Sequence, residues 1–242
     1  MQANLPQISE IWVYLSGSPL LALVLTLSAY LLGLVLYERS ERNPLANPVL
    51  IAVILVTLSI NVLDMPYAKY FEGAQFVHFL LGTATVSLAI PIYKGFASLK
   101  GRMGILMLAL LAGGVTSIFT AIGMARWLGV DESLVQGLVA KSVTAPIAMG
   151  IAERVQASPT LTAIFAVSTG ILGAVLGRYV LDALRITAWW QRGFALGVAA
   201  HGIGTSRAFS VNPEAGAYAS LGMGLHGILG AVLIPYAVAW WF

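Results

Sequence analysis

Long apolar runs separated by short polar stretches cover most of this chain of 242 residues. Many of them approach or exceed the roughly 20 residues that a helix needs to cross a bilayer. Little sequence remains for a soluble domain, so we predict one all-α, polytopic membrane domain that includes residues 1–242. The predicted hydrophobic segments, about eight in all, are residues 19–37, 48–63, 76–93, 104–125, 133–152, 159–179, 189–209 and 215–242.

The composition supports an integral membrane protein. Hydrophobic residues make up 59% of the chain and charged residues only 10%, whereas soluble domains carry roughly a quarter charged residues. The formal charge of +3 is small and scattered, so it indicates orientation in a bilayer rather than a nucleic-acid partner. The absence of cysteine excludes disulfides and thiol chemistry. No basic residue precedes the first apolar run, which we therefore expect to be a retained helix rather than a signal peptide.

The fifth run, LVAKSVTAPIAMGIA, contains a lysine in an otherwise apolar setting. A charged residue at bilayer depth costs roughly 2.5–3.5 kcal/mol and usually faces a bundle interior or a wet cavity. Pro146 removes a helical hydrogen bond beside it, and Ser142 or Thr144 could satisfy the freed backbone. Lys141, Ser142 and Thr144 are therefore predicted to bind an anion. The alternative is a lysine near a helix end that extends to the headgroups.

The sequence HGIGTSRA in the seventh segment is the second candidate. Gly202 and Gly204 favour backbone that leaves the helix, and Thr205 with the freed N–H groups could surround an anion. Arg207 would supply a charge whose planar fork matches a carboxylate. The alternative is a simple turn followed by a surface ion pair between Arg207 and Glu214.

His201 titrates near neutral pH, so it could accept a coupling proton, or it could simply be hydrogen-bonded. No metal-binding or phosphate-binding motif and no nucleophile motif of a hydrolase occurs in the sequence. We therefore predict no metal, no cofactor, no catalytic residue and no enzymatic activity.

Two membrane topologies are compatible with the sequence. The basic stretch 94–102 predicts a cytoplasmic loop. If every segment crosses once, the arginine-containing loop 182–192 falls outside, whereas a re-entrant fifth segment would place it inside. Small polar residues and Pro91 make the third segment a further candidate for an interruption.

A weak internal repeat bears on the same question. Without a gap, Pro19 aligns with Pro159, Ser28 with Ser168 and Gly33 with Gly173; these are the three matches least expected by chance among those found. Five single crossings between the copies would invert the second copy, as is common in secondary transporters. With a re-entrant fifth segment the copies would be parallel.

Four motifs resemble landmarks of the LrgB/CidB family, whose members are often labelled antiholin-like or autolysis-modulating. They occur in family order and cover nearly the whole chain: NPVLIAVILV at 47–56, LLGTATVSLAIPIYK at 80–94, KSVTAPIA at 141–148 and HGIGTSRA at 201–208. Departures from the family pattern occur at Thr83, Ala145 and Ser206.

The resemblance implies two functions. One is regulation of murein hydrolase activity and lysis together with a small LrgA/CidA-like, holin-family membrane partner. The other is transport of small carboxylates such as glycolate, glycerate or pyruvate, as in plastid relatives that are glycolate and glycerate carriers. We expect a multi-pass inner-membrane carrier, or carrier subunit, for a small monocarboxylate, forming a homo-oligomer such as a dimer. At the level of the fold alone, inverted-repeat elevator carriers are the analogy we expect.

Overall fold

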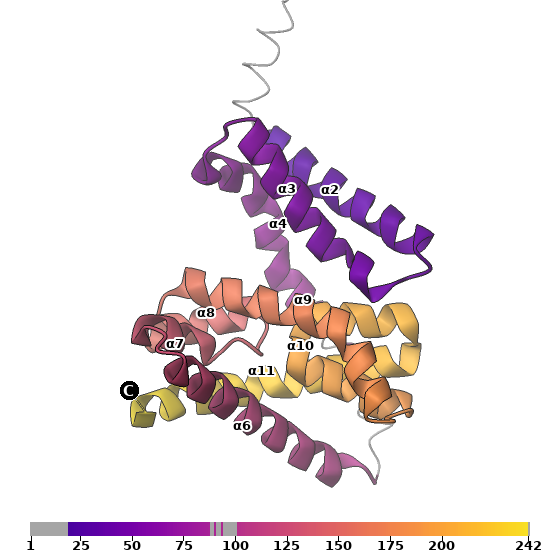
Figure 1. Cartoon of the computed structure of the whole chain (residues 1–242), viewed down its shortest axis with the longest axis vertical. Coiled ribbons are helices and arrows are strands. Elements are labelled where there is room, and N and C mark those ends of the chain that lie inside the picture. Colours follow the sequence, from indigo (N-terminus) through magenta and orange to yellow (C-terminus); the bar gives the residue numbers. More distant parts are fainter. Residues whose placement is uncertain (1–18, 88–89, 91–92, 94–100, 242) are drawn as a thin grey trace, which may run out of the picture. The chain divides into compact units, whose positions relative to one another are not determined.

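The computed structural model describes residues 19–87, 90, 93 and 101–241, and these residues are helical or lie in turns between helices (Figure 1). The described part contains nine α-helices, one short 3-10 helix and no strand, which confirms the all-α prediction. The chain divides into two compact units, Met1–Ala84 and Thr85–Phe242.

The described helices of the first unit begin at prolines or directly after one. Proline is favoured at a helix start because its missing N–H would have no helical acceptor there. Asn47 caps the helix that begins at Pro48, because its side-chain oxygen accepts hydrogen bonds from the N–H groups of Val49 and Leu50. The elements are α2 (Pro19–Arg39), η1 (Pro44–Ala46), α3 (Pro48–Val62) and α4 (Tyr67–Ser87), the last of which extends into the second unit.

The start of α4 corrects one predicted boundary. The segment was predicted from residue 76, but the helix begins at Tyr67, directly after Pro66. The intervening turns carry Lys69 and Glu72, which lowered the hydropathy without breaking the helix, because both side chains are exposed. The interruption predicted at Pro91 lies outside the described residues.

The second unit contains the remaining helices, whose predicted starts were close to those observed. Four described helices in the whole chain are long and apolar enough to cross a membrane, namely α2, α6, α9 and α11. The helices of this unit are α6 (Met103–Trp127), α7 (Glu132–Leu138), α8 (Ala145–Arg154), α9 (Pro159–Ala183), α10 (Trp189–Val211) and α11 (Pro213–Trp241).

The two short helices α7 and α8 form a hairpin. Gly137 lies against Phe165 and Thr162, and Lys141 lines a cavity together with Thr169, so α7 advances in the same direction as α9. Helix α8 must then return, because it ends at Arg154 and the chain re-enters at Pro159, where α9 starts. The hairpin therefore begins and ends beside the start of α9, with its tip at residues 139–144.

Helix α10 is a second hairpin rather than one continuous helix. His201 has φ 39° and ψ −130° inside it, and a Cβ on Gly204 would lie 2.7 Å from the carbonyl oxygen of Leu196. In a continuous helix those residues would be about 12 Å apart along the axis, so the chain reverses at His201. The sequence predicted a break at the following glycines; the observed turn is at the histidine itself.

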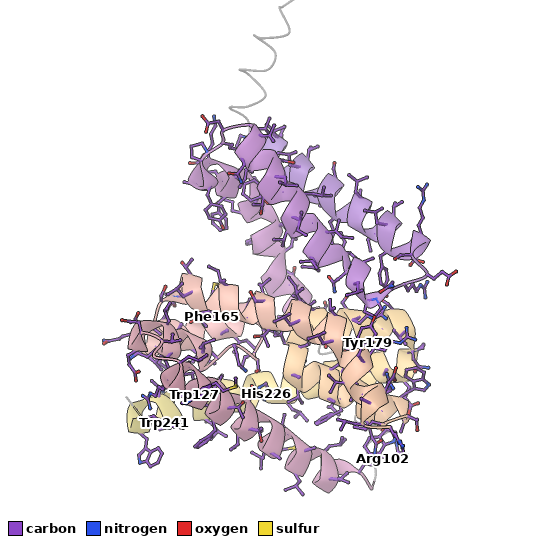
Figure 2. The ribbon with its side chains drawn as sticks, viewed as in Figure 1. Arg102, Trp127, Phe165, Tyr179, His226 and Trp241 are labelled. Carbon is purple, nitrogen blue, oxygen red and sulfur yellow. The ribbon has the colours of Figure 1, made fainter. Side chains whose placement is uncertain are left out.

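The two hairpins come from opposite ends of the unit. Gly193 and Gly197 pack on the backbone of Ala215 and Ala219, so the first arm of α10 runs alongside α11 in the same direction, starting where α9 ends. Figure 2 shows the two ends: Trp127 and Trp241 lie toward one, Arg102 toward the other, and His226 between them.

Side-chain contacts show which helix ends lie together at each end of the unit. Arg102 donates to the Tyr218 hydroxyl (3.3 Å) and lies 4.8 Å from the ring centre of Trp190. At the opposite end, the guanidinium carbon of Arg126 lies 5.7 Å from the ring centre of Trp241. The loop that follows α9 therefore lies at the same end as Arg102, and the α7–α8 hairpin opens at the other end.

Candidate functional site

Lys141 lies at the tip of the α7–α8 hairpin and reaches across to α6. Its Nζ donates to Ser117 Oγ at 2.6 Å and to Ser142 Oγ at 3.2 Å, and the two hydroxyl oxygens are 2.6 Å apart. An ammonium group has three donors, so two of them are directed at neutral hydroxyls of the protein.

The charge of Lys141 is not balanced by a nearby acid in the part of the chain that the structure describes. None of the ion pairs formed by those residues involves Lys141. The lysine, Ser117 and Ser142 line a cavity of about 780 Å³ between α6, α9 and the first arm of α10, and most of the other lining side chains are apolar. A fixed cation in such surroundings attracts a small anion more strongly than it would in water.

The start of α8 adds further donors beside the lysine. Thr144 precedes the helix and is buried, yet its Oγ1 has no hydrogen-bond partner among the described residues. The first intrahelical bond is from the Ala148 N–H to the Thr144 carbonyl (2.8 Å), so the N–H groups of Ala145 and Ile147 precede it. The positive end of this helix dipole and the unpaired hydroxyl both suit a carboxylate.

His201, at the tip of the second hairpin, is buried against α9. Its Nε2 lies 2.8 Å from the carbonyl oxygen of Ala166, and a Cβ on Gly170 would lie only 2.7 Å from its Cε1. The second arm of α10 starts directly after this residue, so a second helix N-terminus faces the interior of the unit. The positive φ of a non-glycine residue is strained, at a cost of about 1–3 kcal/mol.

Helix α11 brings the two tips together. Met223 is the neighbour of Gly202 and Thr205 at the second tip, while Gly230 lies against Val143 at the first tip and Gly227 against Ile147 in the first turn of α8. Seven residues along a helix span about 10 Å, so the two tips lie within about 10 Å of each other along α11. His226 lies between these contacts and is buried against Gly114 of α6, one helical turn from Ser117.

The structure brings most of the predicted binding residues to this level, but not Arg207. Lys141, Ser142, Thr144, His201, Gly202 and Gly204 lie at or beside the two tips. Thr205 is buried and donates to the sulfur of Met223 at 3.8 Å. Arg207 lies six residues beyond the turn, about 9 Å along the helix, and lines a different pocket.

Two polar residues of the site were absent from the predicted set, Ser117 and His226. Ser117 lies in α6, within the predicted segment 104–125, and a lone serine in an apolar helix gives no signal of a site. His226 lies in α11, within the predicted segment 215–242. The rule that singled out Lys141, that ionisable residues inside apolar segments are rarely there by chance, applies equally to His226 and would have included it.

These features define a multi-pass, all-helical membrane protein with a half-buried cationic site. The model of the LrgB-like family matches residues 26–240, and the chain belongs to this family.

The chain is 33% identical to the uncharacterized protein YwbG of Bacillus subtilis over 220 residues, which cover 91% of this chain and 97% of that protein. It is 29% identical to the holin-like protein CidB of Staphylococcus epidermidis over 214 residues, covering 86% and 93%. No solved structure matches the chain.

Proposed function

We propose that the protein carries small monocarboxylates, such as glycolate, glycerate or pyruvate, across the bacterial plasma membrane. The observation that supports this most directly is the Lys141 ammonium, bonded to two serine hydroxyls and to no acid of the described residues. A carboxylate at this position would neutralise the charge and accept the third donor of the ammonium.

The other groups of the site have separate roles in this proposal. The N–H groups at the starts of α8 and of the second arm of α10, with the Thr144 hydroxyl, hydrogen-bond the carboxylate or hydroxyl oxygens. His201 and His226 border the site from the other hairpin tip and from α11. Arg207 takes no part, because it lies in the other pocket.

The paired hairpins support the carrier mechanism. Each arm of α7–α8 and of α10 is shorter than the roughly 20 residues needed to cross, so we place both hairpins as re-entrant segments that enter from opposite sides. The helix-plus-hairpin units α6–α8 and α9–α10 would then be inverted repeats, and the binding site would lie where their tips meet, as in many secondary transporters. These units differ from the Pro19–Pro159 match, whose two copies are parallel in this topology. Alternating access would move one bundle against the other, and the analogy with elevator carriers concerns the fold alone.

The same arrangement favours one orientation. In the described part of the second unit, more arginines lie near one end, namely Arg102, Arg178, Arg185, Arg192 and Arg207, than near the other, which carries Arg126 and Arg154 beside Glu132 and Glu153. The positive-inside tendency assigns the arginine-rich end to the cytoplasm. A re-entrant first hairpin removes the conflict that single crossings would cause for the loop after α9.

Uptake of labelled glycolate or pyruvate by proteoliposomes tests the proposal. We expect Lys141→Ala to abolish uptake and Lys141→Arg to retain part of it, while Lys69→Ala, which removes an exposed lysine of α4, transports normally. Normal transport by folded Lys141→Ala would remove the lysine from the mechanism.

A second candidate function follows from the relatives named holin-like. In this proposal the protein does not transport but regulates murein hydrolase activity and lysis, bound to an LrgA/CidA-like membrane protein and to further copies of itself. The two proposals differ in ligand binding: a carrier should gain thermal stability from small carboxylates, since ligands that bind the folded state raise its Tm, whereas the regulator should not respond.

A further inference from the structure

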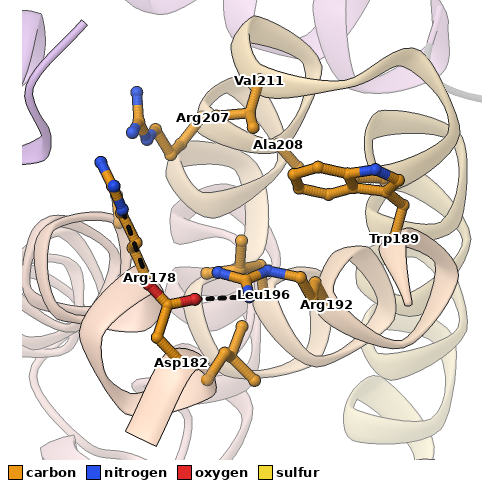
Figure 3. A pocket seen from close by; sticks show the side chains of 11 residues that line it. Arg178, Asp182, Trp189, Arg192, Leu196, Arg207, Ala208 and Val211 are labelled. Atoms are coloured by element: carbon orange, nitrogen blue, oxygen red, sulfur yellow. Dashed lines mark hydrogen bonds and ion pairs between the residues drawn. The ribbon is translucent and has the colours of Figure 1, made fainter. Parts of the chain in front are cut away.

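A second pocket of about 350 Å³ lies where four helix ends of the second unit meet. Helix α9 ends there, α10 begins and ends there, and α11 begins there. Among the described residues, three arginines line it, Arg178, Arg192 and Arg207, together with the carboxylate of Asp182 (Figure 3). These described side chains carry an excess of two positive charges.

The contacts around Asp182 hold part of this cluster in place. One carboxylate oxygen lies 2.6 Å from Arg192 Nη1 and the other 3.6 Å from Arg178 Nε. Arg192 also donates to the carbonyl of Ile186 at 2.9 Å and lies 5.6 Å from the Trp189 ring centre. Its side chain is 14% exposed, whereas that of Arg178 is 61% exposed. Arg192 thus provides a fixed positive charge inside the pocket, and Arg178 provides one that is accessible from outside.

In the proposed orientation, this pocket lies at the level of the phospholipid headgroups on the cytoplasmic side. Its residues are at the ends of the membrane-length helices α9 and α11, and Trp189 and Trp190 are of the type that anchors proteins at the bilayer surface. Basic pockets between helix ends on the cytoplasmic side favour anionic headgroups. One guanidinium group can donate two parallel hydrogen bonds to two oxygens of a phosphate, whereas the ammonium of a lysine acts as a point charge.

We propose that Arg178, Arg192 and Arg207 form a binding site for a phosphate group, carried by an anionic phospholipid of the surrounding leaflet. Its arginines do not line the cavity of Lys141, although the two cavities share Leu181 and Leu196 in their lining. Because Arg207 follows the second tip on one α10 arm and Arg192 precedes it on the other, a bound headgroup joins the open ends of that hairpin to α9.

The test measures the Tm of the full-length protein in neutral detergent with short-chain phosphatidylglycerol, with short-chain phosphatidylcholine, or with inorganic phosphate. We expect phosphatidylglycerol at a large excess over its Kd to raise the Tm by about 5 °C, and phosphatidylcholine to have no effect. Arg178→Gln and Arg207→Gln should each lose at least half of that rise. Arg185→Gln is the matched control, because it removes the same charge from the turn after α9, at the same end of the unit but outside the pocket.

The outcomes separate the alternatives. An equal loss in Arg185→Gln, or a full rise in the Arg178→Gln/Arg207→Gln double variant, would overturn the site. A comparable rise with inorganic phosphate, lost in the same variants, would keep the site and assign it to a soluble phosphate. Native mass spectrometry gives an independent measurement: phosphatidylglycerol should remain bound to the wild type and to Arg185→Gln but not to the double variant, and equal retention by all three would contradict the proposal.

Discussion

The ammonium of Lys141 lies 2.6 Å from the hydroxyl of Ser117, which is 24 residues earlier in the chain. The same hydroxyl oxygen lies 2.6 Å from that of Ser142. One serine of α6 therefore connects this helix to the tip of the α7–α8 hairpin, and any movement of the hairpin relative to α6 must break or remake these bonds.

Replacing Ser117 should weaken substrate binding in the proposed carrier. A hydrogen bond to a charged group contributes about 1.5–3 kcal/mol, and each 1.4 kcal/mol is about tenfold in affinity. We expect Ser117→Ala to raise the KM of carboxylate uptake at least about tenfold. Thr120→Ala is the control, because its hydroxyl bonds only carbonyls of its own helix. A KM within twofold of wild type would show that Ser117 does not position the lysine.

The turn at His201 predicts an unusual order of stability. In a helix interior, alanine is more stable than glycine by about 1 kcal/mol. At φ 39° glycine avoids the strain that any Cβ meets. Both substitutions lose the contact of His201 with Ala166, so we expect His201→Gly to have the higher Tm. The difference should be about 2–4 °C for each kcal/mol of backbone strain that the glycine avoids. A higher Tm for His201→Ala would mean that α10 continues through this position as an ordinary helix.

The close packing of α10 on α11 should not tolerate a methyl group. A Cβ on Gly197 would lie 2.0 Å from the carbonyl oxygen of Ala219, and overpacking typically costs about 1–3 kcal/mol. We expect Gly197→Ala to lower the Tm by several degrees. Gly123→Ala, in α6, has no atom within 4 Å of the added Cβ and should be neutral or slightly stabilising. Similar Tm values for the two variants would contradict the close helix contact.

The hairpin topology can be tested by labelling, because the chain contains no cysteine. Single cysteines at Glu132 and Glu153 should both react with a membrane-impermeant maleimide from outside intact cells, since α7 begins and α8 ends at the same side in our proposal. A cysteine at Arg185 should react only after permeabilisation. Labelling of positions 132 and 153 from opposite sides would show that the segment crosses the membrane.

Asp131 predicts a pH dependence at the start of α7. Its carboxylate accepts from the hydroxyl and the N–H of Ser133, and these bonds hold the pKa of Asp131 below its usual value of 3.8. A lowered folded-state pKa stabilises the fold above the unfolded-state pKa, and this stabilisation disappears as the pH falls through the folded value. We expect Asp131→Asn to reduce the loss of Tm below pH 3.8. An unchanged pH profile would contradict this role of the carboxylate.

The linear sequence determined the class of the protein and several local features. Apolar runs predicted the all-helical membrane fold, and Pro19, Pro48 and Pro159 marked helix starts that the structure confirms. Lys141 and Pro146 also predicted a break in the fifth segment, which the structure resolves as α7 and α8. Such features depend on hydropathy and on backbone chemistry that acts over a few residues.

Only the tertiary structure decided which segments turn back and which polar groups meet. The reversal at His201 is stabilised by packing on α9 and α11, which no local pattern encodes. Ser117, Lys141 and His226 come together from separate helices, whereas Lys141 and Arg207, both cationic and both predicted for one site, belong to different pockets. The physical reason is that the hairpins fold each helix end back toward its start, so distance along the sequence no longer indicates depth in the bilayer.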